Sequence, residues 1–288
     1  ARAHELIAID SCPLFAPGLA GAPAAAQAIA QILADLGKPL DIAATATDAG
    51  LDIDIRGAGK IEFDLTQELI AAAATHDLAR LSNHGVTLIE RRQPLLEIGR
   101  AKIAPPAGGF LQATVAGERA LADLVLAEIA SGKRVADLFA GVGTFALRLA
   151  ERAEVHAVEQ DQASLTALSK AARGAPHLKR VTTEARDLFR RPLLRAELAG
   201  YDALVFDPPR AGAAGQAREL AASDVPLVLA VSCNAQTFSR DARILVDGGY
   251  AMEQATPVDQ FRYSAHVEIV GAFRRAARKK AKKGLLSR

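Results

Sequence analysis

Two residues with reactive side chains follow neighbouring apolar segments of the chain. Cys233 lies two residues after the segment 225–231, and Asp207 follows the segment 203–206 and precedes two prolines. If both segments are parallel strands, their carboxyl ends meet at one edge of a sheet, where open α/β folds bind ligands. A helix start after Cys233 favours the thiolate, so this cysteine is a candidate nucleophile. An inert cysteine and a rigid strand exit are the competing interpretations.

A glycine turn precedes these residues in the chain. It reads Asp137-Leu-Phe139-Ala-Gly141-Val-Gly143 and joins an apolar run to a helical segment, so that backbone N–H groups can approach a ligand closely. Glu159 ends the next apolar run, where an acid accepts hydrogen bonds from ribose hydroxyls. Asp137 repels a diphosphate but accepts from an ammonium group, so the charges favour S-adenosylmethionine over NAD. A purely structural turn is the alternative.

Two further acids have ambiguous roles in the sequence. Asp187 follows the third predicted strand and either accepts from an adenine amino group or is the N-cap of a helix that begins at Leu188 and Phe189. Glu268 alternates with Val267 and Ile269, which predicts a side chain on the solvent face of a strand. Spacing alone therefore does not mark Glu268 as catalytic.

The elements that position these residues alternate between strands and helices. The sequence predicts seven strands, at 134–139, 155–159, 180–183, 203–206, 227–231, 250–256 and 266–273, with helices that include 163–173 and 237–245. This order is typical of a parallel α/β sheet. Residues 257–265 are too few for a crossover helix, so we expect the last two strands to form an antiparallel pair at the edge of the sheet.

The first 110 residues predict a smaller α/β domain. Helical spacing occurs at 24–36 and 66–81, and short strands are expected at 86–90 and 95–98. Strict alternation at 51–55 predicts a half-exposed strand. The Pro- and Gly-rich segment 105–109 is the predicted linker. We therefore divide the chain into a small domain at 1–110, a larger domain at 111–275 and a basic tail at 276–288. In the small domain Arg91, Arg92 and Lys102 are candidates for RNA contact, although a solvated face explains those charges equally well.

Composition indicates a globular protein with a sizeable core. The chain has 288 residues, of which 50% are hydrophobic, and a net charge of +2. Its two cysteines exclude a disulfide framework and favour a reducing, cytoplasmic location, and no uninterrupted apolar span or secretory signal is present. The tail is basic enough to neutralise phosphates, although a solvated end is the commoner explanation. A first residue other than methionine suggests a truncated chain.

Taken together, these motifs resemble those of the S-adenosylmethionine-dependent RNA uracil-C5 methyltransferases that act on transfer RNA and ribosomal RNA. The resemblance covers roughly residues 105–275, and the motifs occur in the family's order. The segments that carry it are Phe110-Leu-Gln112, the glycine turn 137–145, Asp207-Pro208-Pro209-Arg210-Ala-Gly212, Ser232-Cys233-Asn234 and His266-Val267-Glu268.

The resemblance implies a Rossmann-like α/β fold, with a seven-stranded methyltransferase sheet whose last strand is antiparallel, beside the smaller N-terminal α/β domain. It implies that Cys233 is the nucleophile, Glu268 the general base, and Asp207 a group that binds the uracil ring. The implied donor and uracil sites are lined by Gln112, Phe139, Gly141, Glu159 and Asp207. The thiolate would add to uracil C6 and so activate C5, on a base flipped out of structured RNA.

The chain departs from the family at its iron–sulfur segment. Many members resemble one another in binding a 4Fe–4S cluster through four cysteines, and in carrying an RNA-binding barrel upstream. Here Cys12 matches the fourth ligand, and a cluster requires further cysteines in a longer chain. Two other functions stay open: an RNA-binding module that lacks turnover, and an N-methyltransferase that uses Asp207-Pro-Pro on an amino group. The sequence does not indicate the oligomeric state.

Overall fold

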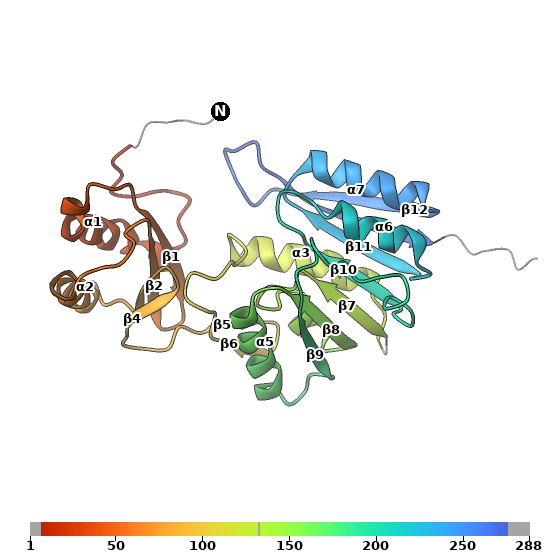
Figure 1. The fold of residues 1–288 in the computed structure, drawn as a ribbon, viewed down its shortest axis with the longest axis horizontal. Helices are drawn as coiled ribbons and strands as arrows, with labels where there is room; N and C mark the ends of the chain where they lie inside the picture. The colour runs from red at the N-terminus through yellow and green to blue at the C-terminus, as the bar shows by residue number, and fades with distance from the viewer. Residues whose placement is uncertain (1–6, 132, 276–288) are drawn as a thin grey trace, which may run out of the picture.

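Two α/β units lie side by side in the computed structural model, which describes residues 7–131 and 133–275 (Figure 1). The smaller unit is built by the N-terminal part of the chain and the larger unit by the rest. The predicted basic tail 276–288 lies outside the described residues. No helix within the described ranges has both the length and the apolar character needed to cross a membrane.

The smaller unit is a four-stranded sheet packed against two helices. The order of its strands is β1-β2-β3-β4, with only β2 and β3 parallel. The elements are α1 (Ala22–Ile32), β1 (Asp41–Thr47), β2 (Gly50–Arg56), α2 (Phe63–Thr75), β3 (Arg80–Asn83) and β4 (Val86–Glu90), with short 3₁₀ turns at Pro17–Leu19 and Ala34–Leu36. The helix predicted at 66–81 is wrong at its end, because Arg80 and Leu81 belong to β3.

The strand predicted to be half-exposed is buried on both faces. Ile53 and Ile55 face the helices, whereas Asp52 and Asp54, on the opposite face, are only 6% and 3% exposed. The linker covers that face: Arg80 donates to the carbonyl of Pro105, and a Cβ on Gly108 would collide with the carboxylate of Asp54. Alternation identified the two faces correctly, but it gave no sign that a distant segment covers the second one.

A buried ion pair joins the middle strands of this sheet. Arg80 donates two hydrogen bonds to the carboxylate of Asp52, at 2.9 and 2.6 Å, and both side chains are 7% exposed. We expect Arg80→Met to lower the free energy of unfolding by about 3–5 kcal/mol, because it leaves a buried carboxylate without a partner. The measurement is urea unfolding followed by circular dichroism.

The matched control for Arg80→Met is Arg91→Met. Arg91 donates to Asp77 at 2.8 Å, but the Asp77 side chain is 72% exposed. Removing an exposed ion pair costs less than about 1 kcal/mol. Equal losses in the two variants would contradict the assignment of a special role to the buried pair.

A hairpin at the end of the smaller unit packs on the larger one. It consists of β5 (Leu96–Ile98) and β6 (Ala101–Ile103). Ile98 and Ile103 share a buried cluster with Val142 and Leu147 of the larger unit. The division at residue 110 stays a prediction, but this hairpin gives the two units a common apolar contact.

The larger unit is a seven-stranded sheet in the order β12-β13-β11-β10-β7-β8-β9. Its elements are α3 (Val115–Glu128), β7 (Arg134–Leu138), α4 (Ala146–Leu149), β8 (Glu154–Glu159), α5 (Gln162–Gly174), β9 (Val181–Ala185), β10 (Ala203–Phe206), α6 (Ala214–Ala222), β11 (Leu227–Ser232), α7 (Ala235–Asp247), β12 (Tyr250–Val258) and β13 (Glu268–Arg275). All seven strands predicted from the sequence are present. The predicted antiparallel pair is confirmed, with β13 lying between β12 and β11 and antiparallel to both.

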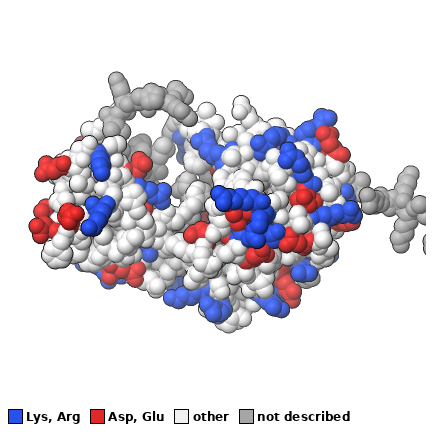
Figure 2. Space-filling model, viewed as in Figure 1, with Lys and Arg blue, Asp and Glu red and all other residues white. Residues whose placement is uncertain are grey.

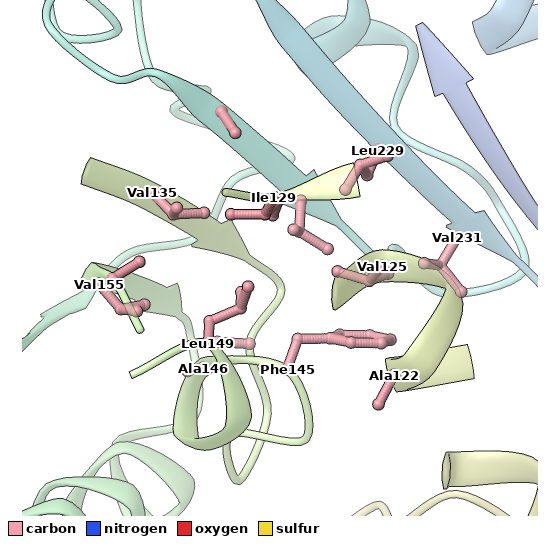
Figure 3. Packing of buried hydrophobic residues seen from close by; sticks show 14 of the residues in the cluster. Ala122, Val125, Ile129, Val135, Phe145, Ala146, Leu149, Val155, Leu229 and Val231 are labelled. Carbon is pink, nitrogen blue, oxygen red and sulfur yellow. The ribbon is translucent and has the colours of Figure 1, made fainter. Parts of the chain in front are cut away.

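Alternating residues of the strands build a core on each face of this sheet. On one face Val135, Val205 and Leu229 pack with Phe145 and with Val125 of α3 (Figure 3). On the other face the opposite residues of the same strands pack against α6 and α7. Because helices cover both faces, polar groups that bind a ligand can gather only at the ends of the strands.

Candidate functional site

Five strands of the larger sheet deliver predicted site residues to one edge. β7, β8, β10 and β11 are parallel, so the residues that end or follow them, among them Glu159, Asp207 and Cys233, lie at the same edge. β13 runs in the opposite direction, and Ser232 pairs with Ile269. Consequently Glu268, the first residue of β13, lies beside Cys233. The structure thus brings together the two residues that the resemblance identifies as nucleophile and base.

The glycine turn after β7 leaves space for a ligand at one position. Gly141 has a φ of +53°, and a Cβ there would meet no atom within 4 Å, whereas a Cβ on Gly143 would collide with Leu168. The N–H of Gly141 donates to Oε2 of Glu159 at 3.0 Å, so the turn and the predicted ribose acid are in contact. The other oxygen of Glu159 accepts from the N–H groups of Gln160 and Asp161. Backbone donors thus fix this carboxylate beside an open turn.

Asp137 is a buried acid that the protein itself does not satisfy. It is 0% exposed, and neither oxygen makes a hydrogen bond of ordinary geometry to another described residue. Burial, and next the charge of Asp207, raise the pKa of Asp137 well above its ordinary value, and only a weak backbone interaction with Ala146 acts in the opposite direction. A buried acceptor without a donor is unfavourable, so Asp137 is suited to a cationic or hydrogen-bonding ligand.

Four side chains form a continuous polar chain across the edge. Nε2 of Gln112 donates to Asp207 at 3.3 Å, and Nε2 of Gln260 donates both to Oε1 of Gln112 and to Oε1 of Glu268, each at 3.1 Å. Glu268 is 5% exposed, so the prediction of a solvent-facing side chain is wrong. The reason is that Gln260, in the loop between β12 and β13, covers its carboxylate. The sequence alone did not identify Gln260 as a site residue. The one feature that could have done so is its position a few residues before Glu268.

The carboxyl groups of Asp207 and Glu268 and the thiol of Cys233 lie close together at the centre of the site, where a charge on one disfavours a charge on another. Burial and the neighbouring Glu268 raise the pKa of Asp207 to about 7; the residue keeps some exposure, but its carboxyl group is enclosed. Burial raises the pKa of Glu268, against the hydrogen bond from Gln260. Asp207 therefore exchanges its proton near neutral pH, as groups in acid–base chemistry do.

The thiol of Cys233 does not gain the help expected from the start of α7. Burial, and next Glu268, raise its pKa, and Arg210 only partly offsets them. The side chain of Asn234 accepts the N–H groups of Gln236 and Thr237, so it occupies the donors at the helix start. The expectation that this helix favours the thiolate is therefore wrong in the absence of ligands.

Two polar side chains of α7 fix the loop after Asp207. The hydroxyl of Thr237 donates to the carbonyl of Arg210, and Asp241, which is 4% exposed, accepts the N–H of Ala213. Arg210 itself lies 2.9 Å from Nδ1 of His266 rather than beside a carboxylate. Because α7 begins just after Cys233, these contacts hold Asp207 and Cys233 in one rigid frame.

Asp187 is engaged locally in the structure. Its Oδ1 accepts the N–H groups of Phe189 and Arg190, as a cap does, but residues 188–190 form a turn and not the expected helix. Its contact with adenine stays a prediction. Phe139, with a φ of +60°, places its ring 5.4 Å from that of Phe189, which is 49% exposed. An aromatic surface therefore lies next to the glycine turn.

The basic side chains that were candidates for RNA contact lie beside acidic side chains. Arg92 and Arg91 both bind Asp77 and hold the pKa of that acid at about 2, and Lys102 lies 3.7 Å from Glu97. Basic and acidic side chains are interspersed on the face seen in Figure 2. Among the described residues, no cluster of three His, Cys, Asp or Glu side chains is suited to bind a metal, and Cys12 is a free thiol.

Two surface hollows lie away from this edge. One is lined by residues that include Arg195, Tyr201 and Val225, and the other by residues that include Lys133 and Arg180. These residues precede the strands of the sheet, so both hollows lie at its amino-terminal edge. Ligands of open α/β sheets bind at the opposite edge, and for this reason we place the functional site there.

The chain is similar to known RNA methyltransferases. The family model described as tRNA (Uracil-5-)-methyltransferase matches residues 124–275. The chain is 48% identical over 269 residues to an uncharacterized RNA methyltransferase of Brucella suis, over 93% of this chain but only 65% of that protein. The 23S rRNA (uracil(1939)-C(5))-methyltransferase RlmD of Halomonas elongata is 39% identical over 55% of this chain and 35% of that protein.

A solved structure matches most of the fold. The tRNA (uracil-54, C5)-methyltransferase of Pyrococcus abyssi, in complex with S-adenosyl-L-homocysteine, superimposes with a TM-score of 0.70 over 93% of this chain and 70% of that one. The two sequences are 18% identical, so the match concerns the fold.

Proposed function

This chain belongs to the tRNA (uracil-5-)-methyltransferase family, and from that premise we propose that it transfers a methyl group from S-adenosylmethionine to C5 of a uridine in structured RNA. The observation that carries the proposal is the meeting of Cys233 and Glu268 across β11 and β13, beside Asp207. A general N-methyltransferase requires neither a thiol nor a second carboxylate at this place. The proposed partner is a transfer RNA or ribosomal RNA, and the proposed location is the cytoplasm.

The residues of the glycine turn and its neighbours would hold the donor. Gly141 leaves room for close approach, Glu159 faces the ribose, and Gln112, Phe139 and Asp187 complete the proposed site. Asp137 offers an unsatisfied carboxyl group to the ammonium of the methionine part. The donor supplies an electrophilic methyl group on a sulfonium. The chain's own task is to bind it, orient it and exclude water.

On the acceptor side, the chain must make uracil C5 nucleophilic. We propose that the Cys233 thiolate adds to C6, which forms a C–S bond and gives C5 enolate character for its reaction with the methyl group. Glu268 then removes the C5 proton, the electrons of the C–H bond restore the C5–C6 double bond, and the thiolate leaves. Asp207, with its pKa near 7, hydrogen-bonds the ring edge. The target base must leave its stack to reach the thiol.

The decisive experiment uses RNA transcripts made with uridine or with 5-fluorouridine. With uridine transcripts of transfer RNA and of 23S rRNA segments, and tritiated S-adenosylmethionine, we expect 5-methyluridine in one of them. With 5-fluorouridine, C5 carries no proton that Glu268 can remove, so the adduct is trapped and survives denaturing electrophoresis. RNA binding without either product would instead favour an RNA-binding module, and a methylated amino group would favour the N-methyltransferase.

We expect Asp137→Asn to weaken donor binding about 10- to 100-fold, the loss typical of a charge-assisted hydrogen bond. The same change should raise the thermal midpoint near neutral pH. The folded-state pKa of Asp137 lies above its unfolded value, so the carboxyl group favours folding at low pH and this contribution is lost as the pH rises. Titration calorimetry with S-adenosylmethionine and thermal unfolding are the measurements.

Asp202→Asn is the control for Asp137→Asn, because the pKa of Asp202 is shifted in the opposite direction. Hydrogen bonds from the backbone N–H of Arg134 and from Lys133 lower the pKa of Asp202, at the amino-terminal edge of the sheet. This variant should leave donor affinity unchanged and should not stabilise the protein. Unchanged affinity in Asp137→Asn would remove this residue from the donor site.

A further inference from the structure

The amide of Gln260 joins the donor side of the site to the base. Its Nε2 lies 3.1 Å from Oε1 of Gln112 and 3.1 Å from Oε1 of Glu268. From this geometry we infer that Gln260 is a positioning residue: it orients the Glu268 carboxylate for removal of the C5 proton, and it ties that carboxylate to Gln112. The inference rests on the proposed function, in which Glu268 is the general base.

The two acceptors fix the orientation of this amide. A side-chain amide nitrogen carries two hydrogens, and here each hydrogen has one acceptor. The reversed orientation would point the amide oxygen at two other oxygens, one of them on an acid. The observed orientation is kept although Oε1 of Gln260 is buried and has no partner among the described residues. The contacts therefore select a double donor at this position.

The start of α3 provides the space for Gln260. Gly117 lies in the first turn of this helix, where Thr114 accepts its N–H. A Cβ on Gly117 would collide with Oε1 of Gln260 and lie 2.8 Å from its Cβ. The side chain thus packs directly on helix backbone, which limits its movement.

The charges around Glu268 explain why a neutral donor is useful there. Asp207, at the end of β10, carries a charge of the same sign as Glu268, and so does the thiolate of Cys233 after β11. Arg210, which follows Asp207, is the nearby cation, but it contacts His266. The hydrogen bond from Gln260 lowers the pKa of Glu268 against the effect of burial. A base must be ionised to accept a proton, so this bond extends activity toward lower pH.

The test compares Gln260→Met with Gln260→Glu. Both side chains are close in size to glutamine, but methionine donates no hydrogen bond, and an ionised glutamate adds a like charge. We expect kcat to fall about tenfold in Gln260→Met, a fraction of what a general base contributes. The acidic limb of the kcat–pH profile should move to higher pH in Gln260→Met and further in Gln260→Glu. Adduct formation with 5-fluorouridine RNA should keep its wild-type rate in Gln260→Met, because that step removes no proton.

Gln254→Met is the matched control, since Gln254 is exposed on β12 and its side-chain amide donates to Thr256, away from the site. It should leave kcat, the pH profile and adduct formation unchanged. Two results with an active wild type would overturn the positioning role alone. In the first, the Gln260 variants keep the acidic limb of the wild-type kcat–pH profile. In the second, the rate of adduct formation falls by as large a factor as kcat. A wild-type chain that forms no adduct and transfers no methyl group overturns the proposed function, and the role of Gln260 with it.

Discussion

Replacement of Cys233 by alanine is expected to abolish both methyl transfer and the trapped adduct. Uracil C5 is too weak a nucleophile to take a methyl group without addition at C6, and the free thiol of Cys233 is the nucleophile that we propose for this addition. We expect a loss of at least about 10³-fold in kcat, the scale seen when a covalent nucleophile is removed. Tritium transfer to RNA and denaturing electrophoresis with 5-fluorouridine RNA are the measurements.

The control for Cys233→Ala is Cys12→Ala. Cys12 is also a free thiol, but it lies in the N-terminal segment, far from the sheet edge in sequence. It should retain full activity, and both variants should keep the affinity for S-adenosylmethionine and the thermal midpoint of the wild type. Methylation that persists in Cys233→Ala would exclude covalent catalysis by this thiol and return the N-methyltransferase to consideration.

The second large effect is expected from Glu268→Gln. The amide fits the same space and keeps an oxygen for Gln260, but it cannot take the C5 proton. Turnover should fall about 10²- to 10⁴-fold, the usual contribution of a general base. Addition and methyl transfer precede proton removal, so ordinary uridine RNA should accumulate as a methylated covalent adduct. A radiolabelled band that survives denaturation, without 5-fluorouridine, is the observation that checks this.

A matched change on the neighbouring strand is Glu253→Gln. Glu253 lies on β12, accepts from Arg274 of β13, and has a side chain that is 48% exposed. It should turn over at the wild-type rate and trap no adduct. Because Glu268 raises the pKa of Asp207, Glu268→Gln should also lower that pKa from about 7, which carboxyl NMR signals can follow. Normal turnover in Glu268→Gln would mean that another group removes the proton.

The sequence predicted the strands of the large sheet well because each is a short apolar run between turns. It also predicted which residues follow the carboxyl ends of those strands, and therefore that Asp207 and Cys233 share an edge. The predictions are wrong where a distant segment of the chain covers a face of a strand that was expected to be exposed. Alternation assigns Asp52, Asp54 and Glu268 to a face of a strand, but it does not show that residues 105–108 or the loop before β13 cover those faces.

The contacts of Gln112 show the same limit. Its partner Gln260 lies 148 residues away, and a glutamine in a loop carries no periodic or motif signal. Only the resemblance drew attention to Gln112 and Glu268, and only the three-dimensional arrangement adds the residue between them. The pKa of Cys233 was misjudged for a related reason: the helix start was predictable, but the burial of the thiol and the capping by Asn234 were not.

The place of β13 has a consequence for synthesis of the protein. Among the described residues this strand is the last, yet it lies between β11 and β12, and its first residue is Glu268. During translation, the part of the sheet that carries the proposed donor site can fold first. However, β11 keeps an unpaired edge until residues 268–275 leave the ribosome. The edge of β11 is therefore covered in the same step that brings Glu268, the proposed proton acceptor, to the site. A nascent chain has all of the proposed reactive groups in place only when β13 has joined the sheet.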